Sequence, residues 1–139
     1  IYAEPLHGEG REVPIAHGRY YFVYYRYVFA FDDNEQLVWA RRLEQDVINA
    51  RVVPNGLFTV GEQGRFQILD RNTGSTGWTG GSERELASAG LDLGAFNPGG
   101  EPGDAVPLRI ALAEIAGDAD NRLIPARAFA VQQLAALPE

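Results

Sequence analysis

The chain has 139 residues and a formal net charge of −7, which suits one ordinary domain with a real core. The negative charge argues against binding to nucleic acid or to anionic membranes, because both need clustered cations. The absence of cysteine excludes disulfide bonds, thiolate catalysis and cysteine-ligated metal sites.

The first half of the chain is predicted to form short antiparallel strands. Residues 1–12 are polar and rich in turn residues, and the strand signals run from 13 to 79. Each predicted strand is rich in aromatic or β-branched residues and is bounded by turn residues. The predicted strands are Tyr20–Tyr25, Tyr27–Phe31, Leu37–Arg41, Val47–Val53, Leu57–Val60 and Phe66–Leu69. Composition places turns at 32–35, 54–56, 63–64 and 72–74.

One sequence pattern occurs twice in this strand region. Its marker residues are Gly18, Asp32 and Trp39 in the first copy and Gly56, Asp70 and Trp78 in the second. The two aspartates are 38 residues apart and the two tryptophans 39 apart. A repeat of about 40 residues made of short strands is typical of β-propeller blades. We expect each indole to pack between neighbouring sheets and each aspartate to accept hydrogen bonds from turn amides.

On these markers, residues 13–79 resemble the PQQ-like (pyrroloquinoline-quinone-dehydrogenase-like) β-propeller repeat. The second copy fits closely, whereas the first has 33–36 in place of the Thr-Gly turn and Tyr24-Tyr25-Arg26 in place of a glycine turn. The resemblance implies antiparallel propeller-type blades, about two in number. Two blades cannot close a ring of four to eight. Either the rest of the ring lies elsewhere in the native protein, or the chain forms a smaller open sheet covered by helices. An ordinary antiparallel sheet with two similar hairpins is the alternative to the repeat.

The second half of the chain is predicted to be helical after a glycine-rich stretch. Within 80–103, Ser82 and Glu85 form a capping-box pattern that opens a short helix, Glu83–Ala89. Asp104 is then predicted to cap a helix over Ala105–Ala116 whose apolar face carries Leu108, Leu112 and Ile115.

A last helix is predicted over Ile124–Leu137, with Pro125 in its first turn. Its apolar face is expected to hold Ala130, Leu134 and Leu137, widened by Ala128 and Val131. The short connection favours an antiparallel pair. This helical hairpin weakly resembles a HEAT-type repeat at Asp118, Arg127, Ala130 and Leu134; a plain helix pair packed on the sheet is the alternative.

The sequence therefore predicts a mainly β chain with C-terminal helices in three parts. Residues 1–79 form the β-propeller-type repeats, 80–103 a glycine-rich linker with a short helix, and 104–139 the helical hairpin.

Few residues in this sequence point to catalysis or cofactor binding. His7 and His17 would need glutamates nearby to hold a metal, and surface positions are the default for both. The run 118–121 suits a helix end and the following cap better than a calcium loop. No serine lies in a nucleophile-elbow context. The quinone cofactor of the PQQ-dependent dehydrogenases sits at the centre of a full ring, which this chain does not supply. We therefore expect no enzyme activity, no cofactor and no metal.

The residues 20–31 hold eight aromatic side chains. One interpretation is a strand buried on both faces, as inner propeller strands are. The other is a recognition surface for a protein or a glycan, because tyrosine offers a large contact area with a polar tip. The residues of that surface would be Tyr20, Tyr21, Tyr24, Tyr25 and Tyr27.

The leading functional hypothesis is a non-catalytic protein-interaction or scaffold module of a larger bacterial protein. The resemblance suggests the periplasm or cell envelope, with the cytoplasm left open. The expected partners are another protein, the rest of the parent protein or an oligomer that completes the sheet.

Because the chain begins with Ile1 rather than Met, we expect a processed protein, a fragment or an excised domain. No apolar run approaches the ~20 residues of a membrane span. The alternative function is small-ligand or glycan binding through the tyrosine-rich strand.

Overall fold

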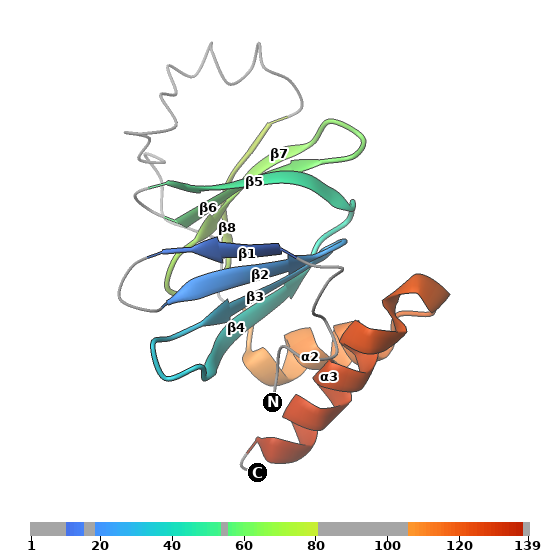
Figure 1. Cartoon of the computed structure of the whole chain (residues 1–139). Coiled ribbons are helices and arrows are strands. Elements are labelled where there is room, and N and C mark those ends of the chain that lie inside the picture. The colour runs from blue at the N-terminus through green and yellow to red at the C-terminus, as the bar shows by residue number, and fades with distance from the viewer. Residues whose placement is uncertain (1–10, 16–18, 54–55, 81–105, 138–139) are drawn as a thin grey trace.

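A computed structural model describes residues 11–15, 19–53, 56–80 and 106–137 of the chain. In these ranges, eight strands form two four-stranded sheets, each in sequence order with every neighbour antiparallel (Figure 1). The first sheet consists of β1 (Arg11–Pro14), β2 (Tyr20–Tyr24), β3 (Tyr27–Phe31) and β4 (Leu37–Arg42). The second consists of β5 (Val47–Val53), β6 (Gly56–Gly61), β7 (Phe66–Asp70) and β8 (Thr76–Gly80). The predicted fold class, mainly β with propeller-type blades and C-terminal helices, is confirmed.

The two sheets repeat each other down to an irregularity in their strand pairing. Ala30 on β3 pairs with Trp39, and Ile68 on β7 pairs with Trp78. In both sheets the register shifts at the next residue, between Ala30 and Phe31 and between Ile68 and Leu69. The repeated sequence pattern therefore encodes two antiparallel strand meanders with the same pairing irregularity.

The strands differ from the prediction most clearly at β1 and at Tyr25. Strand β1 lies partly in 1–12, which was predicted to be rich in turns, and its residues pair with β2. Tyr25 was predicted to lie in a strand, but it lies in the tight β2–β3 turn with φ of 53°. Left-handed backbone normally favours glycine, which agrees with the glycine turn that the repeat pattern expects at this place.

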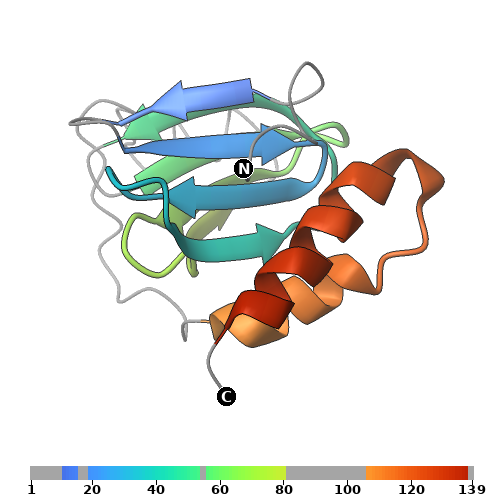
Figure 2. The same ribbon diagram turned by 60° about the horizontal axis from the view of Figure 1, so that its bottom comes forward.

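The C-terminal helices are α2 (Leu108–Ala116) and α3 (Ile124–Ala136), joined through a 3₁₀ turn, η2 (Asn121–Leu123). Helix α3 runs back alongside α2 (Figure 2), as predicted. The predicted start of the first helix at Ala105 is wrong, because Val106 and Pro107 are not helical and α2 begins at Leu108. The residue before a proline is disfavoured in the helical region, so Pro107 delays the start. The predicted short helix Glu83–Ala89 lies outside the described residues.

The molecule has three layers, with the first sheet between the helical hairpin and the second sheet (Figure 1). One face of the first sheet packs against both helices, and Phe29 stands edge-on to Phe129 of α3 with ring centroids 5.1 Å apart. The opposite face packs through Tyr21 and Trp39 against Leu57 and Leu69 of the second sheet. Strands β2 and β3 are therefore buried on both faces, as one interpretation of the aromatic run predicted.

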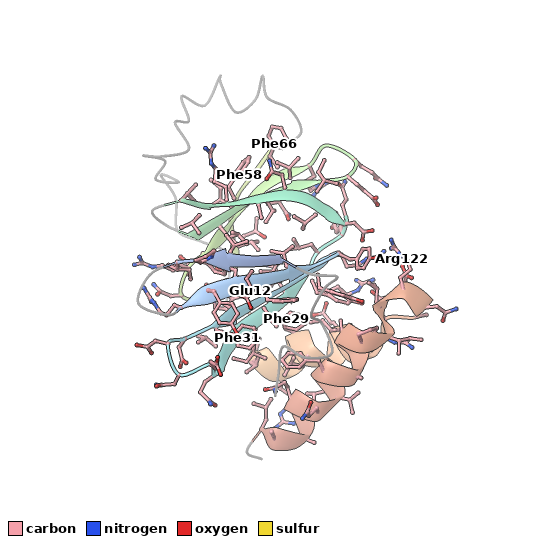
Figure 3. All side chains as sticks on the ribbon, viewed as in Figure 1. Glu12, Phe29, Phe31, Phe58, Phe66 and Arg122 are labelled. Atoms are coloured by element: carbon pink, nitrogen blue, oxygen red, sulfur yellow. The ribbon has the colours of Figure 1, made fainter. Side chains whose placement is uncertain are left out.

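The far face of the second sheet carries a separate apolar cluster. Phe58, Phe66 and Ile68 alternate with the residues that face the first sheet, and Val53 joins them. Figure 3 shows Phe58 and Phe66 on the side of the second sheet that points away from the first.

The apolar face of α3 is rotated from the predicted one. The buried residues are Ala126, Phe129 and Ala130, whereas Val131 is 56% exposed and Ala128 is also exposed. The prediction that Ala128 and Val131 widen the buried stripe is therefore wrong. Phe129 decides the rotation, because it is the largest apolar side chain of the helix and inserts against the aromatic face of the first sheet.

Candidate interaction site

Four of the five tyrosines of the predicted recognition surface are buried. Tyr21, Tyr24 and Tyr27 are 0% exposed, and Tyr20 is 8% exposed. Their side chains alternate between the two faces of the first sheet, because neighbouring residues on a strand point to opposite sides. Tyr25 alone stays half-buried, since it lies in the turn. The five rings therefore do not form one exposed surface, and Tyr25 is the member that a partner can reach.

The two repeat aspartates shape the turns that follow their strands. The Oδ1 of Asp32 accepts hydrogen bonds from the amides of Asn34 and Gln36 at 2.8 and 2.9 Å. The Oδ2 of Asp70 accepts from the amides of Asn72 and Thr73, both at 2.9 Å. The predicted role of both aspartates is thus confirmed by the turn geometry.

Trp39 is wedged between the two sheets, as the repeat predicted for the first indole. It is 3% exposed, its ring lies 5.7 Å from that of Tyr21, and its Nε1 donates to the carbonyl of Arg71 at 2.9 Å. Gly74 lies against the indole face with φ of 75°, and a Cβ added there would collide with the ring. Gly56 is likewise held against the β7 backbone at Leu69. Gly18 and the side chain of Trp78 lie outside the described part of the chain.

A cluster of charged side chains joins the first sheet to the helical hairpin at one corner. Arg26, in the β2–β3 turn, reaches three carboxylates: Asp46 at 3.2 Å, Asp120 at 3.2 Å and Asp118 at 3.8 Å. Asp118 also accepts from Arg42 of β4 at 3.0 Å. The local sequence pattern predicts only a helix end and a cap at 118–121. Asp120 does cap η2, accepting from the amide of Arg122 at 3.0 Å. The partners across the chain could not be found from local spacing.

Hydrogen bonds and charges of this corner lower the pKa values of Asp118 and Asp120. Burial opposes ionisation of Asp118, but the Tyr27 hydroxyl, the amide of Asp120 and Arg42 outweigh it and lower the pKa of Asp118 to about 2. Hydrogen bonds from the side chain and amide of Arg122 lower the pKa of Asp120. These carboxylates are therefore ionised at neutral pH and bind arginine side chains of the same chain.

Arg122 connects this charged corner to the exposed surface. Its guanidinium lies 4.8 Å from the centroid of the Tyr25 ring and donates to Asp46 and Asp120 at 3.0 and 2.7 Å. Figure 3 shows Arg122 at the end of the first sheet, where the connection between the two helices lies. Arginine and tyrosine are both enriched in protein interfaces.

An exposed apolar stripe begins two residues after Arg122. Ile124 is 51% exposed and Val131 56% exposed, and the exposed Ala128 and Ala135 continue their line along α3. Residues at i, i+4, i+7 and i+11 share one face of a helix. We call Tyr25, Arg122, Ile124, Ala128 and Val131 the corner surface. The spacing of 124, 128, 131 and 135 is visible in the sequence, but only the position of Phe129 shows that this stripe faces outward.

The Asp–Arg pair of the HEAT-like positions is close in space. Arg127 donates from Nη1 to the backbone carbonyl of Asp118 at 2.6 Å, and Ala130 is fully buried. This contact ties the loop between the helices to α3.

Within the described ranges, no three histidine or acidic side chains converge in a way that could hold a metal ion. His7 and His17 lie outside those ranges. Neither helix of the described chain is both long and apolar enough to cross a membrane.

No protein-family model matches the sequence, and a search of curated proteins finds no match. Among solved structures, the chain is similar to the crystal structure of BamB from Moraxella catarrhalis, with a TM-score of 0.46 and 16% sequence identity. The match covers 50% of this chain and 22% of that chain, so this chain spans less than a quarter of the length of the structure it matches.

Proposed function

We propose that this chain is a non-catalytic protein-interaction module of a larger bacterial envelope protein, and that the corner surface binds its protein partner. The main observation that supports this proposal is that Tyr25 and Arg122 lie beside the start of an exposed apolar helix face. The envelope or periplasmic location follows from the resemblance of the strand region to the PQQ-like repeat.

The chemistry of the corner surface supports a protein partner. Large exposed aliphatic side chains gathered on one face, beside polar groups, are typical of docking sites. Arg122 is held by two carboxylates and the Tyr25 ring, so little conformational freedom remains to be lost when a partner binds. A preorganised arginine and tyrosine next to apolar contacts is the composition of an interface hot spot.

Site-specific photocrosslinking tests this proposal. A benzophenone amino acid is placed at Val131 on the corner surface and, as a control, at the exposed Asn34 in the β3–β4 turn. Expression of the parent protein in its own cells should give an adduct of defined mass from position 131 and none from position 34. Adding Tyr25→Ala to the first probe should reduce the yield. The same adducts from both positions, or no adduct from 131, would contradict the proposal.

A further inference from the structure

A second candidate site lies at the opposite end of β2, in the seam between the two sheets. It is a pocket of about 110 Å³, several times the space that one water molecule needs. Its walls come from the first sheet through Tyr21 and Trp39 and from the β3–β4 turn through Asp32. The β7–β8 turn contributes Arg71 and Asn72. Arg19, just before β2, lines it as well.

The pocket is lined by a tyrosine whose buried hydroxyl has no partner among the described residues. Tyr21 is 0% exposed, and its OH makes no hydrogen bond within that part of the chain. Buried polar groups are nearly always hydrogen-bonded, so an unsatisfied one calls for an explanation. Burial raises the pKa of Tyr21 to about 12, against the opposing effect of Arg71 and Arg19. The hydroxyl is therefore protonated at neutral pH and able to donate a hydrogen bond.

Two arginines near this hydroxyl also lack a side-chain partner in the ranges that the structure describes. The guanidinium groups of Arg19 and Arg71 form no hydrogen bond or ion pair with the rest of the described chain. Arg26, Arg42 and Arg122 at the other end of the molecule are all paired with carboxylates.

The acidic residues near the pocket accept hydrogen bonds from the turns that follow their strands. Asp32 accepts two turn amides and Asp70 two turn amides and the hydroxyl of Thr73. Their negative charge is thus partly compensated by the turns they shape. The lining residues thus bring one phenol hydroxyl and two guanidinium groups as donors, against the single carboxylate of Asp32.

The site is also held in place before any ligand binds. Trp39 donates to the carbonyl of Arg71, which fixes the β7–β8 turn against the first sheet. Asp70 and Gly74 close that turn from within, the amide of Gly74 donating to the carbonyl of Asp70 at 2.8 Å.

We propose that this pocket binds a carboxylate group, which receives hydrogen bonds from the Tyr21 hydroxyl and from Arg19 and Arg71. Guanidinium groups match the geometry of a carboxylate, and hydrogen bonds to ionised acceptors are the strong ones. Trp39 is 3% exposed and offers no free ring face, which argues against a sugar stacked in the same place. The carboxylate belongs to a free small acid, an acidic side chain or a chain terminus, three sources that share one chemistry. This site goes beyond the corner surface and does not depend on it.

Nuclear magnetic resonance titration of the full chain tests the proposal. The probes are acetate, acetyl-Ala-Glu-Ala-amide, and acetyl-Ala-Ala-Ala with a free C-terminus. Acetyl-Ala-Gln-Ala-amide and matched chloride are the controls. The indole N–H of Trp39 and the amides of Arg71 and Asn72 should shift and saturate with at least one carboxylate and with neither control. The probe that binds most tightly identifies the source. Absence of saturable shifts with all three carboxylates would overturn the proposal.

Two matched variants separate binding from folding. Tyr21→Phe removes only the hydroxyl, so affinity should fall about tenfold while Tm stays at or above that of the unmodified chain. Tyr27→Phe removes a buried hydroxyl on the other face of the same sheet and should leave the affinity unchanged. Equal affinity in Tyr21→Phe, or a lower Tm without ligand, would show that the hydroxyl already has a partner and would overturn the assignment. Tyr25→Ala should leave the titration unchanged, so failure here and failure of the corner surface are distinguishable.

Discussion

Trp39 contributes to stability through burial and through one hydrogen bond. Its indole fills the space between the sheets and its Nε1 pins the β7–β8 turn. We expect Trp39→Ala to lower the free energy of unfolding by about 3–5 kcal/mol, because a large aromatic is removed from a closed layer. Urea denaturation followed by far-ultraviolet circular dichroism measures this loss. A loss below ~1 kcal/mol would mean that the ring is not part of a packed core.

Asp118 makes the stability of the chain depend on acid pH. Its pKa is about 2 in the folded chain, below the ordinary value of ~3.9, so the unfolded chain binds more protons between those values. Stability from this group is therefore complete above about pH 4 and is lost as pH falls toward 2. Asp118→Asn should reduce the free energy of unfolding by about 1–3 kcal/mol at pH 7. That difference should disappear near pH 2, as urea titrations at pH 7, 4, 3 and 2 would show. A constant difference over this range would contradict the assignment.

At the residue scale, local chemistry could be predicted and long-range pairing could not. Asp32 and Asp70 each bind amides within four residues, so the turn composition was sufficient to predict their roles. Arg26 and Asp118 are 92 positions apart in sequence, and no spacing rule connects them. The same holds for Tyr21 and Arg71, which line one pocket only because the second sheet packs on the first.

At the scale of elements, composition and bounding turns predicted the strands, while the buried side of α3 depended on tertiary packing. All six predicted strands are present, and no end differs by more than one residue, since their composition and bounding turns are strong signals. A helix with alanine on most sides has only a weak amphipathic pattern, so its orientation follows the one large residue, Phe129. The predicted burial of Val131 is therefore wrong, and its side chain is exposed.

Phe129 should therefore control how firmly the hairpin is attached. Its ring lies 5.1 Å from that of Phe29 and 6.3 Å from that of Phe31. We expect Phe129→Ala to destabilise the chain by about 3–5 kcal/mol, with the hairpin affected first. Hydrogen exchange should then show a larger loss of protection in α2 and α3 than in β6 and β7. Val131→Ala, on the exposed face of the same helix, is the control and should change protection little. A uniform loss across the chain after Phe129→Ala would show that the hairpin does not open on its own.

At the scale of the whole molecule, the three layers depend on one another through the first sheet. Strands β2 and β3 contribute to the core under the helices and to the core between the sheets. The hairpin thus covers a face that carries Tyr20, Phe22, Tyr24, Tyr27, Phe29 and Phe31, all buried.

Removal of residues 106–139 should expose that aromatic face and make the remaining chain self-associate. Soluble monomers rarely expose contiguous apolar patches above a few hundred Å², and each aromatic ring that loses its cover adds about 150–250 Å² at most. We expect the truncated chain to elute as oligomers or aggregates and to bind a hydrophobic dye strongly, as light scattering after size exclusion would measure. The full chain with Phe129→Ala should fall between the two, because its hairpin stays tethered and can still cover the sheet. A truncated chain that remains monomeric with unchanged circular dichroism of its strands would mean that the two sheets are stable without the helices, and that the helical hairpin has a role other than covering the first sheet.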